Sequence, residues 1–254
     1  MPRFAANLTM MFTELPLLER FSAAKSAGFD GVEVLFPYDA SASDLLDRIA
    51  GNGLTLALIN CPPPNYTEGP RGFAAIPGGQ ARFQHDFKRS LRYAKALGAQ
   101  HLHLMAGVAT GPEAKATYID NLAWAARHAP TQSLTIEPIN PHDMPGYFLN
   151  DYDLAAEVLD TVGARNLHLQ FDAYHAHRIT GDVTGTWGKM GQRVAHVQIA
   201  GHPGRHEPGT GDIDYKAFFA RLDADHYAGW VGGEYNPKGR TEDGLGWRRQ
   251  HLAV

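Results

Sequence analysis

Four oxygen-bearing side chains end four short apolar runs of this sequence. They are Glu137, Asp172, Gln198 and Glu234, at the ends of Ser133–Glu137, Asn166–Asp172, Val194–Gln198 and Trp230–Glu234. Each run has the pattern of a buried β-strand, in which packing gives no reason for a polar last residue. Three carboxylates and an amide oxygen suit Mg²⁺ or Mn²⁺, whereas zinc prefers histidine and cysteine. The four residues predict one oxygen-rich metal cage. The alternative is that Glu137 and Glu234 are solvated rim residues in ion pairs.

The spacing of these residues indicates how the chain brings them together. They lie 172 − 137 = 35, 198 − 172 = 26 and 234 − 198 = 36 residues apart. A strand–helix–strand unit takes roughly 30 residues. We therefore expect the four side chains on consecutive strands of a parallel sheet, converging on one side of its edge.

Short apolar runs and amphipathic stretches alternate along the chain. Strands are predicted at Arg3–Leu8, Gly31–Phe36, Leu54–Asn60 and His101–Met105, besides the four runs above. Helices are predicted at Pro16–Ala27, Asp44–Asn52 with Ser43 as N-cap, Ala81–Leu97, Pro112–His128, Tyr152–Val162 and Tyr215–Leu222, while Gly181–Gly188 is less regular. Eight strand–helix units without a linker predict a single (β/α)8 TIM barrel, one domain over residues 1–254. A doubly wound open sheet is the alternative.

In a barrel of this kind the active site lies at the carboxyl ends of the strands. Every predicted strand has a polar residue near that end, and these are Asn7, Glu33, Asn60, His103, Glu137, Asp172, Gln198 and Glu234. Side chains alternate between the two faces of a strand, so His168, Gln170 and Asp172 share one face. The ring of polar strand ends favours one active site in the mouth of the barrel.

Three further residues lie in segments next to this mouth. His175 comes just after the sixth strand, although a core or surface histidine is the alternative there. Arg205 follows the seventh strand and could bind a carboxylate or an enolate oxygen, with pairing to Glu207 as the alternative. Arg71 is a second candidate for a substrate carboxylate, unless it is only a mobile surface residue. It stands in the proline-rich loop Cys61–Gly79, which is long enough to act as a lid.

Charge and composition exclude several classes of protein. The net charge of −4 disfavours general attraction to nucleic acid. Cys61 is the single cysteine, so an internal disulfide and a multi-cysteine metal site are excluded, and a structural thiol is expected. There is no glycine-rich phosphate loop, so no nucleotide cofactor is expected. No apolar run or secretory signal points to a membrane, which makes the cytoplasm the expected compartment. A homo-oligomer is left open.

At these residues the chain resembles the hydroxypyruvate isomerase family, within the xylose-isomerase-like TIM barrels. The resemblance runs over nearly the whole chain and becomes specific only when its motifs are taken together. The motifs are Phe4–Leu8, Gly31–Tyr38, Ile136–Asn140, Gln170–Asp172, His196–Gly201, Pro203–Pro208, Gly233–Tyr235 and Thr241–Trp247. One departure is Asn236, where relatives often have lysine or glutamine.

The resemblance implies an aldose–ketose isomerase of small hydroxy-oxo acids. The expected reaction converts hydroxypyruvate to tartronate semialdehyde through an enediolate, with a 2-oxotetronate as the alternative substrate. Glu137 and Glu234 are implied to be catalytic. The implied metal ligands are Glu137, Asp172, Gln198 and Glu234, and the expected substrate-binding residues are His175, Arg205, Arg71 and His103.

Other activities remain open on the same barrel. A sugar epimerase or an inosose-type dehydratase would use the same cage and differ in the size of its pocket. A DNA-repair endonuclease would need several zinc ions, more histidine ligands and a basic surface, which Gln198 and the net charge disfavour. A non-catalytic ligand-binding barrel would have no need of both Glu137 and Glu234.

Overall fold

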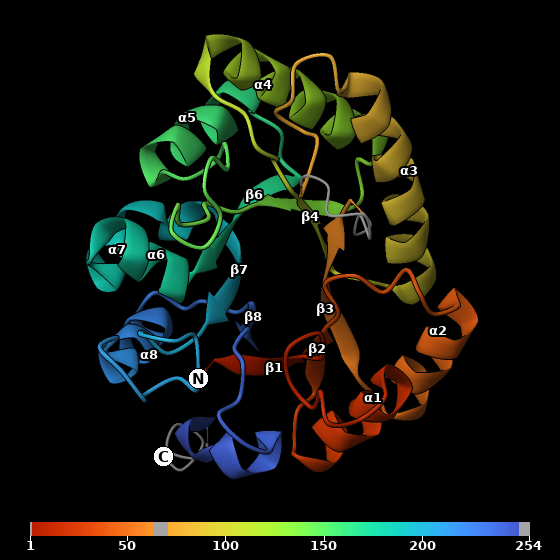
Figure 1. Ribbon diagram of the computed structural model, residues 1–254, viewed down its shortest axis with the longest axis vertical. Coiled ribbons are helices and arrows are strands. Elements are labelled where there is room, and N and C mark those ends of the chain that lie inside the picture. The colour runs from red at the N-terminus through yellow and green to blue at the C-terminus, as the bar shows by residue number, and fades with distance from the viewer. Residues whose placement is uncertain (1, 63–70, 249–254) are drawn as a thin grey trace.

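The computed structural model describes residues 2–62 and 71–248 of the chain. Eight parallel strands pair in sequence order, and β1 also pairs with β8, so the sheet closes into a barrel (Figure 1). The closing ladder aligns Arg3 with Trp230 and Ala6 with Gly233. The predicted (β/α)8 barrel is therefore confirmed, and the open doubly wound sheet is wrong.

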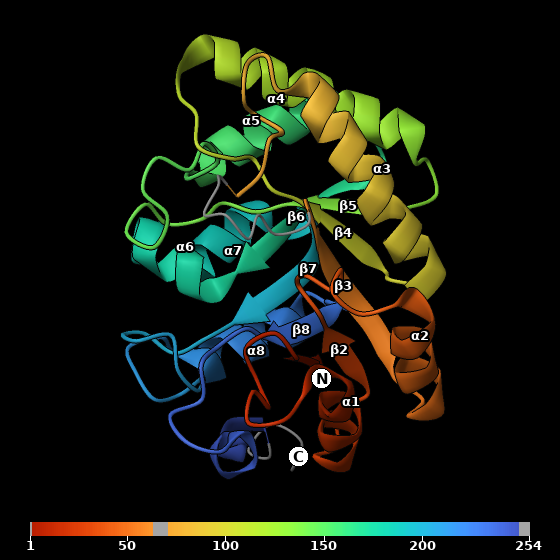
Figure 2. The ribbon, with the colours of Figure 1, turned by 45° about the vertical axis from the view of Figure 1, so that its right-hand side comes forward.

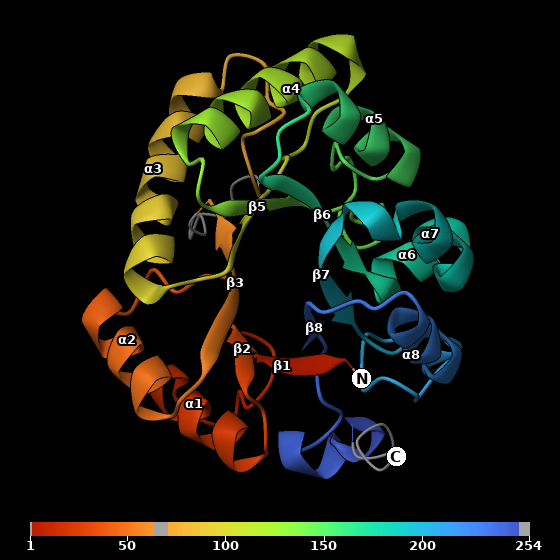
Figure 3. The ribbon, with the colours of Figure 1, turned by 180° about the vertical axis from the view of Figure 1, so that it is seen from behind.

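The strands lie inside a ring of helices, which Figure 2 shows turned by 45° and Figure 3 shows from behind. The strands are β1 (Arg3–Asn7), β2 (Gly31–Glu33), β3 (Thr55–Cys61), β4 (His101–Leu104), β5 (Ser133–Ile136), β6 (Leu167–Asp172), β7 (Val194–Ile199) and β8 (Trp230–Gly233). The helices are α1 (Leu17–Ser26), α2 (Ala42–Gly51), α3 (Gln80–Leu97), α4 (Gly111–His128), α5 (Tyr152–Val162), α6 (Ala173–Thr180), α7 (Val183–Met190) and α8 (Tyr215–Ala224). Short 3-10 turns η1 (Gly191–Arg193) and η2 (Thr241–Gly244) complete the described elements.

The structure corrects several predicted boundaries. The strand predicted at Gly31–Phe36 is only Gly31–Glu33, and its pairing with β3 shifts register between Val32 and Glu33. The predicted N-cap Ser43 is wrong. Ser41 has the extended backbone and accepts the Asp44 N–H, while Ser43 lies inside the first turn of α2. The irregular stretch after β6 contains two helices, α6 and α7.

The outward faces of the strands are apolar and pack against the helices. On β6, Phe171 lies 5.5 Å from Trp187 of α7 and 5.8 Å from Phe218 of α8, measured between ring centroids. The residues on either side of Phe171, Gln170 and Asp172, point the other way, into the barrel, as strand alternation requires. This apolar layer between strands and helices is the main hydrophobic core.

The amino-terminal end of the barrel is closed by an indole ring. Trp230 packs with Ala5 and Ala57, and its N–H donates to Gln100 Oε1 at 3.0 Å. Arg3 lies over the same ring at 4.4 Å. The opposite end, where the polar strand ends gather, is thus the end that holds a site. Among the described residues, no helix is long and apolar enough to cross a membrane.

Candidate active site

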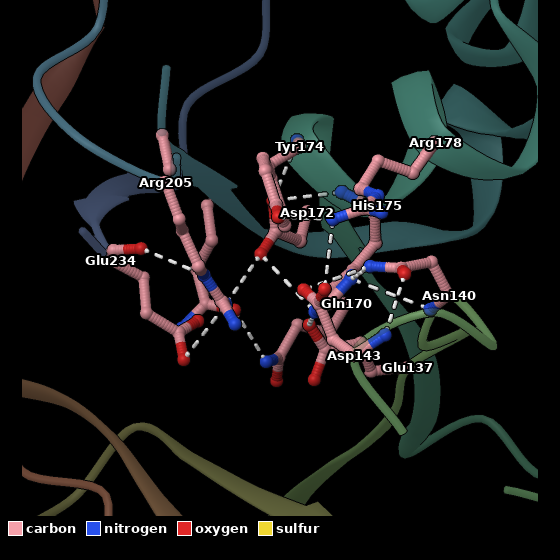
Figure 4. A network of polar contacts seen from close by, with 12 residues as sticks. Glu137, Asn140, Asp143, Gln170, Asp172, Tyr174, His175, Arg178, Arg205 and Glu234 are labelled. Atoms are coloured by element: carbon pink, nitrogen blue, oxygen red, sulfur yellow. Dashed lines mark hydrogen bonds and ion pairs between the residues drawn. The ribbon is translucent and has the colours of Figure 1, made fainter. Parts of the chain in front are cut away.

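All eight polar strand-end residues are buried in the mouth of the barrel. Glu137 directly follows β5 and is 5% exposed, and Glu234 directly follows β8 and is 8% exposed. These low values make the alternative of solvated rim residues wrong for both. Figure 4 shows Glu137 and Glu234 on opposite sides of Asp172.

The two carboxylate oxygens of Asp172 have different partners, one in the backbone of α6 and one in the site. Its Oδ1 accepts the backbone N–H groups of Tyr174 and His175, at 2.7 and 3.4 Å, and so caps the start of α6. Its Oδ2 faces the site and lies 3.2 Å from Arg205 Nη2. The cap therefore fixes the direction in which the second oxygen points.

Arg205 connects the carboxylates of two different strands. Its Nη2 lies 3.2 Å from Asp172 Oδ2 and 3.3 Å from Glu234 Oε1, and its guanidinium packs over the Tyr174 ring at 5.1 Å. The backbone of Arg205 has φ +54°, a left-handed conformation that is uncommon outside glycine and is here held by the surrounding loop. Pairing with Glu207, the alternative considered from sequence, is wrong, since Glu207 Oε1 accepts the Lys238 N–H.

His175 is held in one tautomer by Asn140 (Figure 4). Asn140 Oδ1 accepts the backbone N–H groups of His142 and Asp143, so its Nδ2 is the group that faces His175 Nδ1 at 2.7 Å. Since an amide nitrogen only donates, Nδ1 carries no proton. Burial, and then the charges of arginines nearby, lowers the pKa of His175 well below its ordinary value. The neutral ring therefore has its proton on Nε2.

This Nε2–H points toward the acidic centre of the site. It lies 3.7 Å from Asp172 Oδ2 and 3.9 Å from Glu137 Oε1. Although Glu137, Asp172 and His175 are close enough to share a metal ion, the tautomer gives His175 a hydrogen-bond donor here rather than a lone pair. The sequence placed His175 near the mouth, but nothing in it indicated the part played by Asn140.

Gln198 belongs to a buried network that the sequence did not indicate. Its Nε2 donates to Glu33 Oε2 at 2.9 Å, and its Oε1 accepts from Gln170 Nε2 at 2.7 Å. Glu33 also accepts from Asn7 Nδ2 at 2.9 Å and lies 2.5 Å from His196 Nε2. A carbonyl oxygen has two lone pairs, so Gln198 Oε1 keeps one for a further partner.

Burial and mutual repulsion act on the carboxyl groups of the site. Burial raises the pKa of Glu137 well above its ordinary value, and the charges of Glu234 and Asp172 raise it further. Burial also raises the pKa of Glu234 to about 8, against the opposing charge of Arg205. Burial raises the pKa of Asp172 as well, and Arg205 again opposes it. Such a site holds a carboxyl proton near neutral pH, which suits proton transfer.

The donor set fits a divalent cation. Within the described part of the chain, Glu137 Oε1 and Glu234 Oε2 are buried without a hydrogen-bond partner. Three carboxylates face one guanidinium, so the ionised centre has an excess of negative charge that a cation would compensate. The oxygen-rich composition favours Mg²⁺ or Mn²⁺ over zinc.

The remaining predicted residues have different outcomes. His103 is buried, with Nδ1 3.7 Å from Glu137 Oε2, so it lies at the site. Arg71 is exposed and its part in substrate binding stays a prediction. In the predicted lid Cys61–Gly79, residues 63–70 lie outside the described residues. Burial raises the pKa of Cys61 to about 12, which disfavours a thiolate nucleophile.

Fold and site define an α/β barrel whose strand ends enclose a buried carboxylate centre. Residues 21–251 match the family described as the xylose isomerase-like TIM barrel. The chain is 46% identical to a 2-oxo-tetronate isomerase from Cupriavidus necator over 99% of both proteins. It is 40% identical to the hydroxypyruvate isomerase of Escherichia coli, covering 97% of this chain and 98% of that protein.

A solved structure extends the similarity to three dimensions. It is that of a protein described as an AP endonuclease, family 2, from Brucella melitensis, and it is 43% identical with a TM-score of 0.95 over 99% of both chains. The chain belongs to the xylose isomerase-like TIM-barrel family. The resemblance seen in the sequence motifs is thereby confirmed.

Proposed function

We propose that this protein is an isomerase that interconverts hydroxypyruvate and tartronate semialdehyde. The observation that carries the proposal is the buried pair Glu137 and Glu234, on opposite sides of Asp172, with both pKa values raised. Relatives that match over almost their whole length are named as isomerases of small hydroxy-oxo acids, which supports the same reaction.

The reaction moves one carbon-bound proton between adjacent carbons. One glutamate takes the proton from C3 of hydroxypyruvate, leaving an enediolate, and the other glutamate gives a proton to C2. The proton of the C3 hydroxyl passes to the oxygen on C2, so that C3 becomes the aldehyde. Two carboxyl groups in buried surroundings, one ionised and one protonated, suit these two roles.

Arg205 and His175 stabilise the negative charge of the enediolate. Arg205 already contacts two carboxylates and can shift one of these contacts to a substrate oxygen. The Nε2–H of His175, whose orientation Asn140 fixes, donates to the same region. Arg71 is a further candidate for the substrate carboxylate.

A divalent cation, Mg²⁺ or Mn²⁺, would be held by Glu137, Asp172, Gln198 and Glu234. When bound, it would polarise the carbonyl and acidify the neighbouring C–H. Gln198 is suited to this role because Gln170 and Glu33 fix the orientation of its amide.

A 2-oxotetronate is the second candidate substrate. It is favoured by the relative from Cupriavidus necator, which has a higher identity to this chain than the Escherichia coli isomerase has. The reaction and the residues would be the same, and only the room for one more carbon would differ. Comparing kcat/KM for hydroxypyruvate and a 2-oxotetronate decides between them.

The similar protein from Brucella melitensis is described as an endonuclease, but the site of this chain does not favour that activity. Such an endonuclease would need several zinc ions and more histidine ligands, whereas the centre described above is built of three carboxylates and the Gln198 amide. The net charge of −4 also disfavours a DNA-facing surface.

The proposed activity is tested by following the conversion of hydroxypyruvate by NMR, with and without added Mn²⁺ or Mg²⁺. We expect turnover that falls after treatment with EDTA and returns when metal is added back. No turnover of either oxo acid under any metal condition, together with cleavage of abasic DNA, would overturn the proposal. Full activity after EDTA treatment would show that the reaction needs no metal and that the two glutamates are sufficient. The single-domain extent over residues 1–254 and the cytoplasmic location also stay predictions.

A further inference from the structure

A second group of metal-binding side chains lies outside the barrel mouth. His177 of α6 and His202 of the β7–α8 loop have ring centroids 4.6 Å apart. Asp212, farther along the same loop, has Oδ2 3.3 Å from His202 Nδ1. One ligand atom from each of the three residues lies within 4.8 Å of the others. Two imidazoles and a carboxylate thus converge outside the buried carboxylate centre.

The loop backbone holds two of these side chains together. The N–H of Asp212 donates to the carbonyl of His202 at 2.8 Å. Gly211 allows this close approach, since a methyl group at that position would lie 1.6 Å from the same carbonyl oxygen. His177 comes from the last turns of α6, where its carbonyl accepts the N–H of Gly181. Contacts within the protein therefore hold the backbone of all three residues in place.

The cluster is open to ions in solution. The side chain of His202 is 25% exposed and that of Asp212 is 66% exposed. Two imidazoles with one carboxylate form a borderline donor set, which prefers Zn²⁺, Ni²⁺ or Cu²⁺ to Mg²⁺. The oxygen-rich centre in the barrel has the opposite preference.

We propose that His177, His202 and Asp212 form a second metal site, which binds a borderline divalent transition-metal ion such as Zn²⁺. The bound ion joins the β7–α8 loop to α6. Since that loop holds Arg205 and that helix begins at the cap made by Asp172, the ion fixes the two segments that meet at the barrel mouth. This site does not depend on the proposed isomerase activity.

The test uses the full chain and Zn²⁺ as the probe, with affinity measured by competition with a chromophoric chelator in excess Mg²⁺. We expect His177→Gln, His202→Gln and Asp212→Asn each to weaken the binding of one Zn²⁺ by about tenfold or more. The matched control is His85→Gln, because His85 is also an exposed histidine beside a carboxylate, Asp86, at 3.3 Å, yet belongs to no cluster of this kind among the described residues. Its Zn²⁺ affinity should equal that of the unchanged protein.

Two further measurements keep the outcome decisive. EPR of the Cu²⁺-loaded protein should show two coordinated nitrogens, reduced to one in His177→Gln and in His202→Gln. His202→Cys should retain Zn²⁺ binding, because a thiolate can replace the imidazole as a ligand. If His202 only supported the loop structure, cysteine would not restore Zn²⁺ binding. Unchanged Zn²⁺ affinity in either glutamine variant, or a Cu²⁺ spectrum without two nitrogens, would overturn the proposal.

Discussion

The two faces of the same strands have opposite chemistry. On β6, Phe171 packs outward among aromatic rings, whereas Gln170 and Asp172 on either side of it point inward to amide and guanidinium groups. The outward layer is the main core of the protein, and its contacts are non-directional. The inward layer is a network of specific hydrogen bonds and ion pairs. Stability is expected to depend mainly on the first face and chemistry on the second.

This separation explains how a barrel tolerates so much polarity inside. An unpaired buried polar group costs free energy, but here Glu33 has partners from two other strands, Asn7 of β1 and His196 and Gln198 of β7. Gly232 provides the room, since a methyl group there would lie 1.7 Å from Glu33 Oε1. Glu137 and Glu234, which each keep an unpartnered oxygen, are the residues proposed to act on substrate.

The largest expected effect comes from the inward carboxyl groups. Glu137→Gln and Glu234→Gln should each lower kcat by about 10³- to 10⁴-fold, because an amide neither takes nor gives the proton. The thermal unfolding temperature should change little, since neither carboxylate belongs to the outward core. Steady-state kinetics and calorimetry on the same samples measure both. Near-normal turnover in either variant would contradict the assignment.

The converse substitution is in the outward layer. Phe218 is fully buried on α8 and packs on Phe171 and Trp187. Phe218→Ala should lower the free energy of unfolding by about 3–5 kcal/mol, through lost burial and the cavity left behind. At temperatures where the variant is folded, its kcat and KM should match those of the unchanged protein. A large change in kcat of the folded variant would show that the two faces are coupled.

The two faces also differ in how far sequence predicts them. Alternation along β6 and the spacing of strand ends were enough to predict the barrel and the ring of inward groups. The pairing of Glu33 with His196, which are 163 residues apart, depends on barrel closure and has no local signal. Arg205, which contacts Asp172, has a left-handed backbone conformation that the sequence does not indicate. The start of α2 was misplaced because two serines near it offer equivalent hydroxyl caps.

A smaller effect is expected from a change at Glu33, which belongs to the inward network but is not one of the reacting groups. Glu33→Gln replaces an acceptor with a group that also donates, opposite the donors of Asn7 and Gln198. We expect the free energy of unfolding to fall by about 1–3 kcal/mol. The Mn²⁺ concentration needed for half-maximal activity should rise about tenfold or more, since the Gln198 amide loses its fixed orientation. Urea unfolding and metal titration measure these effects. If only stability falls, Glu33 has no part in orienting Gln198.

At neutral pH the smallest expected effect is a pH dependence that arises inside the barrel, and it grows as the pH falls. Burial lowers the pKa of His101 from 6.5 to about 3, and His196, 5.4 Å away between ring centroids, adds to the shift. Below about pH 6.5 His101 takes up a proton in the unfolded chain, whereas in the folded barrel it stays neutral down to about pH 3. The free energy of unfolding should therefore fall with decreasing pH across this window, by up to about 1.4 kcal/mol per pH unit for this group.

Removing the group separates this contribution from the rest of the protein. In His101→Gln the slope of the unfolding free energy against pH should be smaller between neutral pH and about pH 4. The decrease should correspond to the uptake of about one proton on unfolding. His85→Gln, at an exposed histidine on α3, is the control for removing a histidine elsewhere in the protein. Urea unfolding at a series of pH values gives both slopes. Equal slopes for His101→Gln and the unchanged protein would mean that the polar inward face adds no penalty for protonation. The two faces of the strands would then differ in their packing and not in the free-energy cost of holding a charge.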